Sequence, residues 1–229
     1  MSQTGEAKRP VGRPRADGRP PITREAVFEV TARLIASHGY AGTSLRMIAA
    51  ELGASAPSIS QMFGAKHQLL NELVRTMAGV SIAFHEKLAS MELQPEVRLY
   101  KMVFEEVLAV SSANESMISL FYLPELRQNE FSAAQQARDD MMGFYRETLT
   151  RGISSGVFRE VNPAIATEQV FQLTETAIIA RSPRKLGAPA SMAADTAELV
   201  LRALLDRPSR LPRIAASARR VNLQMLPSA

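Results

Sequence analysis

The chain has 229 residues, a net charge of +4 and no cysteine. That length is sufficient for one small and one medium domain, and the absence of cysteine excludes a disulfide, a thiolate metal site and a cysteine nucleophile. The sequence has no run of about 18 apolar residues and no apolar segment behind its basic N-terminus, so we expect a cytoplasmic protein that does not contact a membrane.

The charge is unevenly distributed along the chain. Residues 1–24 and 206–229 each carry +4, whereas residues 25–205 carry −4. A basic segment beside a compact domain favours contact with a phosphate backbone, although a solubilising disordered tail has the same charge pattern. Residues 1–22 are rich in Pro, Gly and Arg without apolar periodicity, and we expect them to form a disordered basic arm. Residues 208–229 are expected to form a basic C-terminal tail.

Helical periodicity begins at Thr23. Apolar residues from Val27 to Ile35 predict a first helix that ends at Gly39. Thr43 or Ser44 caps a short second helix that ends at Gly53, and Ser55 caps a third with Pro57 in its first turn. These three helices predict a small bundle, a domain over residues 23–68.

The rest of the chain also has helical spacing, and no β pattern of any length occurs. The spacing, caps and breakers predict helices over residues 66–90, 95–112, 114–124, 131–153, 163–181 and 191–205, with a short helix at 213–222. We therefore predict an all-α protein with a second domain over residues 69–207.

The first domain carries a motif. The segment runs TREAVFEVTARLIASHGY and then AGTSLRMIAAELGASAPSISQMFGAKHQLL, over residues 23–70. It resembles the N-terminal domain of the TetR family without a gap, in about a dozen positions that include Arg24, Gly39-Tyr40, Gly53 and Phe63. The resemblance covers a fifth of the chain and implies a helix-turn-helix domain that binds double-stranded DNA, followed by an all-helical domain that binds a ligand and dimerises.

In such a unit the second helix crosses the DNA backbone and the third lies in the major groove. Hydroxyl groups at helix starts and the free N–H groups beside them suit phosphate contacts. The residues predicted to contact the DNA backbone are Arg24, Tyr40, Thr43, Ser44, Arg46, Ser55 and Lys66. For the hydroxyls the alternative is simple capping, for Tyr40 it is packing on the domain core, and for Lys66, whose phosphate role comes from the resemblance, it is a solvated surface charge.

The third helix departs from the family pattern where specificity is decided. Ala56 and Pro57 lead it, Ser60 replaces the family's usual Tyr, and no Arg or Lys on this helix is available to read guanine. We expect Gln61 to contact a base, plausibly adenine, and Ala56 or Pro57 to contact a thymine methyl group. Ser58 is expected to hydrogen-bond a base or a phosphate.

A reading helix with so little charge needs affinity from elsewhere. The arm contains Val11-Gly-Arg-Pro-Arg15 and Gly18-Arg-Pro20, which look like the core of an AT-hook, in which Arg lies along a narrow A·T minor groove. We therefore predict minor-groove or phosphate contacts by Arg13, Arg15 and Arg19. The tripeptide is short, and the competing interpretation of the protein is a sequence-tolerant DNA-organising factor that uses this arm.

No catalytic constellation is found, so we do not expect an enzyme, a cofactor or a metal. His38, His67 and His85 lie in different predicted helices without metal-ligand spacing, and His85 is interpreted as half of a surface pair with Glu86.

The resemblance implies an effector pocket between the fourth and eighth helices. Bulky and soft side chains are predicted to line it, and ordinary core packing is the alternative for each: Met77, Met102, Phe104, Met117, Phe121, Tyr122, Met141, Phe144, Tyr145 and Phe171. They favour an apolar or amphipathic small molecule.

The helices at 163–181 and 191–205 resemble the family's dimerisation pair. Their apolar residues are predicted to form the homodimer interface: Leu173, Ala177, Ile178, Ala197, Val200, Leu201 and Leu204. A dimer would present two reading helices about one DNA turn apart, which matches a palindromic operator. The ligand is expected to swing the fourth helix and to change that spacing, which releases the operator.

Overall fold

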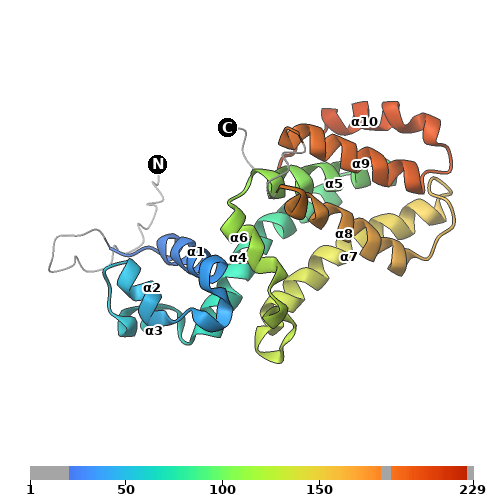
Figure 1. Ribbon diagram of the computed structural model, residues 1–229. Coiled ribbons are helices and arrows are strands. Elements are labelled where there is room, and N and C mark those ends of the chain that lie inside the picture. The colour runs from blue at the N-terminus through green and yellow to red at the C-terminus, as the bar shows by residue number, and fades with distance from the viewer. Residues whose placement is uncertain (1–20, 182–186, 226–229) are drawn as a thin grey trace, which may run out of the picture.

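A computed structural model describes residues 21–181 and 187–225, with the side chains of all of these except residues 176–181 (Figure 1). In this part of the chain every element is a helix, apart from an isolated antiparallel bridge between Phe158 and Leu205. The α-helices are α1 (Arg24–Gly42), α2 (Leu45–Glu51), α3 (Ala56–Phe63), α4 (Lys66–Ala89), α5 (Pro95–Ser112), α6 (Glu115–Ser119), α7 (Ser132–Ser154), α8 (Pro163–Arg181), α9 (Pro189–Leu204) and α10 (Leu211–Arg220). The predicted all-α fold is confirmed.

Short polar side chains start several helices as predicted. Thr23, Ser44 and Ser55 each accept a hydrogen bond from a backbone N–H of the following turn, which satisfies one of the donors that a helix start leaves free. Asn114 does the same for α6. Gly39 breaks the helical backbone of α1, as predicted, with a φ of 70° and a ψ of 167°, and a short further turn extends to Gly42.

The helix predicted over residues 114–124 ends early, because α6 stops at Ser119 and a chain of short turns leads from it to α7. Three 3-10 helices follow α6: η1 (Leu120–Tyr122), η2 (Pro124–Arg127) and η3 (Asn129–Phe131). Pro124 has no N–H to continue a helical ladder, and each turn is closed by i to i+3 bonds instead.

The buried side chains form two hydrophobic cores. The first core joins α1, α2, α3 and the N-terminal half of α4 to the 115–134 segment. We call residues 21–75, which form most of this core, the head. The second joins the C-terminal half of α4 to α5, α7, α8, α9 and α10, and we call it the body. α4 runs through both cores, and α7 contributes Ala134 to the first core and its later buried residues to the second. The boundary predicted between residues 68 and 69 falls inside α4. Figure 1 shows the head at one end and α8–α10 at the other.

α5 lies at the centre of the body and is covered by α7, α8, α9 and α10. α10 was expected in a basic tail, but Leu211, Ile214, Ala215 and Ala218 are buried against the body. α10 is therefore part of this core, while its arginines face outward. None of the described helices is long and apolar enough to cross a membrane.

Candidate DNA-binding surface and effector site

α2 and α3 form a helix-turn-helix with a tight junction. Gly53 provides a φ of 59° in the turn between them, a conformation that favours glycine. Ile48, Ala49, Ile59 and Phe63 are buried and fix both helices on α1 and α4. The packed face thereby determines which side of α3 remains open.

The open side of α3 consists of Pro57, Ser58, Ser60 and Gln61, and we call these four residues the reading edge. All four are exposed or half-exposed at the surface, whereas Ala56 packs partly buried against the head core. The Oγ atoms of Ser55 and Ser58 lie 2.8 Å apart, and Ser55 also accepts the Ser58 N–H. The reading edge therefore starts from a capped and ordered turn.

The second junction holds α3 against α4. Gly64 has a φ of 78°, and the side chain of Gln68 packs so closely on it that an added Cβ would overlap Gln68 Oε1. The same oxygen accepts the Ala65 N–H at 2.7 Å. Sequence analysis did not single out these two residues, although a glycine between two helices is the signal for such a turn.

Lys66 lies at the start of α4 and is half-buried. Its Nζ donates to the carbonyl oxygens of Tyr40 and Thr43, at 2.7 and 2.8 Å, and lies 4.0 Å from the centre of the Tyr40 ring. The cation thus ties the end of α1 to α4 in the DNA-free chain. Burial raises the pKa of the Tyr40 hydroxyl, and the charges of Glu130 and Glu125 raise it further.

The residues predicted to contact the DNA backbone differ in how exposed they are. Ser44, Arg46 and Ser55 are exposed at the helix starts beside the reading edge. Thr43 is only 2% exposed, and its hydroxyl donates to the Gly39 carbonyl oxygen at 2.9 Å. The prediction that the Thr43 hydroxyl contacts a phosphate is therefore wrong for this conformation.

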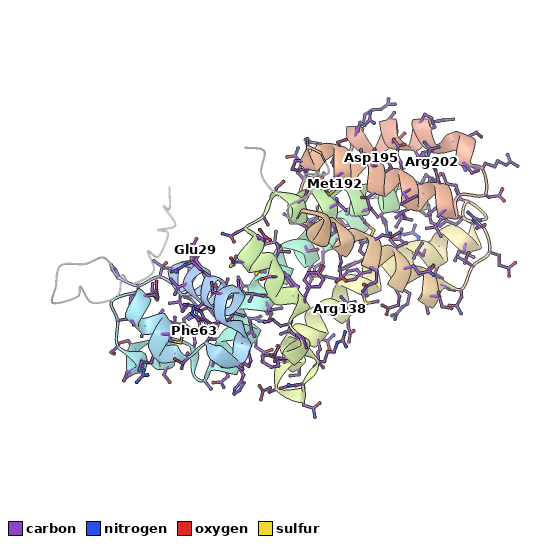
Figure 2. The ribbon with its side chains drawn as sticks, viewed as in Figure 1. Glu29, Phe63, Arg138, Met192, Asp195 and Arg202 are labelled. Carbon is purple, nitrogen blue, oxygen red and sulfur yellow. The ribbon has the colours of Figure 1, made fainter. Side chains whose placement is uncertain are left out.

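Arg24 begins α1 but is held by the head itself. Its guanidinium pairs with Glu72 and lies 4.4 Å from the centre of the Phe63 ring, which Figure 2 labels in the head. Arg13, Arg15 and Arg19 of the predicted AT-hook-like arm lie outside the described residues.

The ten predicted pocket residues do not line one cavity. Met77, Met117 and Phe121 pack against the head core, so they lie where the head meets the 115–134 segment. Met102, Tyr145 and Phe171 are buried in the body core, and Phe104, Met141 and Phe144 are packed around it. Tyr122 is 38% exposed as a whole residue, while its hydroxyl is partly buried and lies 3.5 Å from the Glu175 carbonyl oxygen. A single pocket from all ten is therefore wrong, because α4 and the 115–134 segment divide them between two cores.

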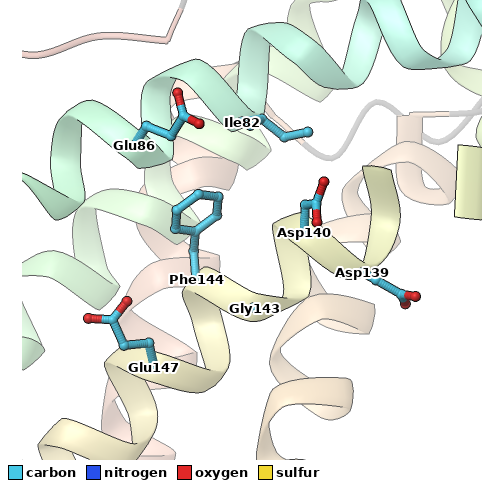
Figure 3. Close-up of a pocket in the computed structure, with 7 residues that line it drawn as sticks. All are labelled: Ile82, Glu86, Asp139, Asp140, Gly143, Phe144 and Glu147. Atoms are coloured by element: carbon cyan, nitrogen blue, oxygen red, sulfur yellow. The ribbon is translucent and has the colours of Figure 1, made fainter. Parts of the chain in front are cut away.

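One hollow does lie among the predicted helices. It is an open groove of about 500 Å³ between α4 and α7 (Figure 3). Its lining is Ile82, Glu86, Asp139, Asp140, Gly143, Phe144 and Glu147. Of the predicted pocket residues only Phe144 belongs to it, and every ionisable group in the lining is a carboxylate.

Behind the groove the body buries a polar cluster that sequence analysis missed. His85 is 1% exposed, and its Nε2 lies 2.8 Å from Oε1 of Glu106 on α5, which also accepts a hydrogen bond from Ser81. The interpretation of His85 as half of a surface pair with Glu86 is therefore wrong. The available signal was the spacing of Ser81 and His85 by one helical turn, with Glu106 inside an apolar stripe.

The predicted dimer residues on α9 are used within the chain. Ala197, Val200, Leu201 and Leu204 are between 0% and 7% exposed in the body core, where α9 packs against α5. They have no surface left for a partner, so this part of the prediction is wrong. The opposite face of α9 is open, and Figure 2 labels Met192, Asp195 and Arg202 along this helix.

The residues of α8 that were predicted to form the dimer interface differ from those of α9. Leu173 is half-buried at the edge of an open hollow formed with Glu168, Gln169 and Gln172. The side chains of Ala177 and Ile178 lie outside the described residues.

The geometry defines a protein with a helix-turn-helix head joined by one long helix to an all-helical body. Residues 27–73 match the family model described as bacterial regulatory proteins, tetR family, and none of the curated proteins matches the chain. The head is therefore similar in sequence to the bacterial regulatory proteins of the tetR family.

Solved structures extend the similarity beyond the head. AmtR of Mycobacterium smegmatis is 25% identical and superposes with a TM-score of 0.70, over 92% of this chain and 100% of that one. PfmR of Thermus thermophilus, a TetR family transcriptional regulator, is 24% identical with a TM-score of 0.67, over 77% and 97%. AibR, solved in complex with isovaleryl coenzyme A and operator DNA, is 19% identical with a TM-score of 0.65, over 77% and 96%. Body and head together therefore have the fold of these regulators.

Proposed function

We propose that this protein is a ligand-responsive transcriptional repressor, which binds a palindromic operator as a homodimer and is released by a small amphipathic effector. The observation that carries the proposal is the course of α4. In its first turn Gln68 closes the junction with α3 and Lys66 holds the end of α1. Its last turns carry Phe84 and His85 into the body. A change of packing in the body is thereby coupled to the position of the reading edge.

DNA binding is assigned to the reading edge and to the helix starts beside it. Gln61 is the largest polar side chain there and is suited to a bidentate contact with adenine, while Pro57 and the exposed part of Ala56 suit a thymine methyl group. Ser44, Arg46, Ser55 and Ser58 are placed for phosphate contacts. The fold similarity to AibR, which was solved with operator DNA, supports this assignment.

We place the dimer interface on the open faces of α8 and α9. Ile165 is 57% exposed and Leu199 56% exposed, which is costly for large apolar side chains in water. Two copies related by a two-fold axis would cover these residues in a four-helix bundle. Leu199→Glu is expected to shift the molar mass in light scattering from dimer to monomer, and an unchanged mass contradicts the placement.

The effector is assigned to the body, and the coupling to DNA is reciprocal. Since the effector favours one position of α4, it lowers operator affinity by the same factor by which operator lowers effector affinity. AibR was solved with isovaleryl coenzyme A as well as operator DNA, which supports a ligand in a body of this fold.

The test begins with selection of binding sites from random DNA by the full-length protein. A palindromic consensus and a large preference over random DNA are expected. Gln61→Ala is expected to relax one position in each half-site and to weaken binding by about 1–3 kcal/mol, while Gln94→Ala at the exposed start of α5 leaves binding unchanged. Equal affinity for selected and random DNA would instead favour a sequence-tolerant DNA-organising protein.

The arm is tested separately by deleting residues 1–20. We expect weaker operator binding and a flatter dependence of log K on log salt, since each phosphate contact contributes roughly 0.9 to the slope. An unchanged slope rules out arm contacts with phosphate and leaves DNA binding to the head.

A further inference from the structure

His85 lies in surroundings that suit a positive charge. Three aromatic rings surround the imidazole, with centroids 5.2 Å away for Phe84, 5.4 Å for Phe144 and 5.5 Å for Tyr145. The Glu106 carboxylate lies 2.8 Å from its Nε2. Aromatic faces combined with a buried carboxylate are the means by which proteins hold organic cations. His85 occupies the centre of such a cage.

The cage is not fully satisfied by the chain. The Nδ1 of His85 and the hydroxyl of Tyr145 are buried and have no hydrogen-bond partner among the described residues. A buried polar atom without a partner is costly and is uncommon in a folded core. Two of them in neighbouring rings show that contacts within the described chain leave the polar groups of the cage partly unused.

The groove between α4 and α7 has the same charge preference as the cage. Figure 3 shows Glu86 on α4 and Asp139, Asp140 and Glu147 on α7 around it. Among the described residues Glu86, Asp139 and Asp140 form no ion pair. Clefts lined by charges of one sign attract ligands of the opposite sign.

Two of the ion pairs among the described residues involve the groove lining. Arg98 and Arg151 both approach Glu147, each at 3.7 Å. They offset one of the four carboxylates, so the lining keeps an excess of negative charge.

Phe144 connects the groove to the cage. Figure 3 shows its ring extending from α7 toward α4, where it lines the groove. The same ring stacks on His85 with an interplanar angle of 29°. A rotation of this half-buried side chain would open the groove onto His85, Glu106 and Tyr145.

From these two sites we infer that the effector is an organic cation with an apolar or aromatic body. The cation enters the acidic groove, displaces the Phe144 ring and takes the place of His85 beside Glu106. This inference rests on the proposed ligand-responsive function and deepens it. It separates this chain from AibR, which was solved with a coenzyme A thioester, because the phosphates of that ligand class would be repelled by the groove.

The displacement of His85 also provides the signal. His85 belongs to α4, so a ligand that moves it acts directly on the helix that carries the head. No separate relay between effector and DNA is required.

The test uses the full-length protein with three named probes. Tetraphenylphosphonium is an aromatic cation, triphenylphosphine oxide is a neutral aromatic analogue, and isovaleryl coenzyme A is an anion. Calorimetry is expected to show binding of the cation, at least tenfold weaker binding of the neutral compound and no binding of the anion. Binding of the anion but not of the cation overturns the inference, and so does binding of neither.

Two variants locate the binding site. Glu106→Gln keeps the shape of the side chain and is expected to weaken tetraphenylphosphonium binding at least tenfold. The triple variant Glu86→Gln, Asp139→Asn, Asp140→Asn changes only side chains at the surface, so it folds even if the buried variant does not, and is expected to weaken binding about tenfold and to flatten its salt dependence. The matched control is Glu92→Gln, Glu160→Gln, Asp206→Asn, which removes three carboxylates elsewhere on the surface and leaves binding unchanged. Equal binding by the triple variant and its control overturns the inference.

Operator affinity, measured by fluorescence anisotropy with and without tetraphenylphosphonium, separates the two proposals. Weaker operator binding with the cation supports both. If the protein binds its operator but no cation, the proposed function stands and this inference fails. If it binds the cation without any change in operator affinity, the proposed ligand response fails.

Discussion

The head and the body bury different kinds of side chain. In the head core the buried polar residues are Thr31 and Thr43, and the rest is apolar. The body instead buries charged groups, five of them on α5: Glu96, Arg98, Lys101, Glu105 and Glu106. An apolar core has one way of packing well, which suits a surface that must fit DNA. Ion pairs can exchange partners, and that suits the change of state that we propose for the body.

Buried ion pairs also make the body sensitive to single substitutions. Desolvation offsets most of the attraction within such a pair, so that the pair contributes little net stability. Removal of one partner, however, leaves the other charge buried and unpaired. Removal of one charged partner should therefore cost more in the body than in the head.

High pH is expected to have the largest effect, because it acts on all four tyrosines together. Burial raises the pKa of Tyr40, Tyr100, Tyr122 and Tyr145, and the charge of Glu106 adds to the rise for Tyr145. The folded pKa values lie above the unfolded value, so this contribution to stability is complete below about pH 10 and is lost as the pH rises further. The absorbance of tyrosinate should therefore rise at a higher pH in the folded chain than in the urea-unfolded chain. Tyr145 in the body should ionise at a higher pH than Tyr40 in the head. Simultaneous ionisation at pH 10 would contradict the burial of these hydroxyls.

The next largest effect is expected from Lys101→Ala. Lys101 and Glu105 are both buried, and their Nζ and Oε1 atoms lie 2.8 Å apart. The substitution leaves the Glu105 carboxylate without its cation and should cost about 3–5 kcal/mol in the free energy of unfolding. The matched control in the head is Arg33→Ala, whose partner Glu51 is exposed, and it should cost less than about 1 kcal/mol. Urea unfolding monitored by circular dichroism measures both, and equal losses would remove the distinction between the two cores.

Local signals in the sequence predicted most of the fold, because they act over a few residues. Thr23, Ser44 and Ser55 cap their helices where their types and positions indicate. The reading edge also followed from periodicity, since Ile59 and Phe63 turn one face of α3 inward and leave Gln61 on the other.

Local patterns in the sequence do not show which helices pack against each other when they lie far apart along the chain. A stripe of apolar residues on α9 shows that one face is buried, but not that α5 covers it rather than a second subunit. For the same reason the local pattern of α4 could not show that Glu106, 21 positions further along the chain, is the hydrogen-bond partner of His85. Thr43 was assigned to DNA from its type, while its burial depends on how α1 ends at Gly42.

The smallest effect, and the one most specific to the head, concerns its two buried threonines. The hydroxyl-bearing residue Thr31 is 1% exposed, and its Oγ1 has no hydrogen-bond partner among the described residues, whereas that of Thr43 donates to the Gly39 carbonyl oxygen. Thr31→Val replaces an unpaired hydroxyl with a methyl group of similar size and is expected to stabilise the chain by about 1 kcal/mol. Thr43→Val is its matched control and should destabilise by about 1 kcal/mol, because it removes a formed hydrogen bond. Opposite signs in urea unfolding, with operator affinity unchanged by Thr31→Val, would show that the head core needs no polar group except the one that closes α1. If both substitutions destabilise, the hydroxyl of Thr31 has a structural role, and the contrast between an apolar head and a charged body is weaker than the burial of these residues indicates.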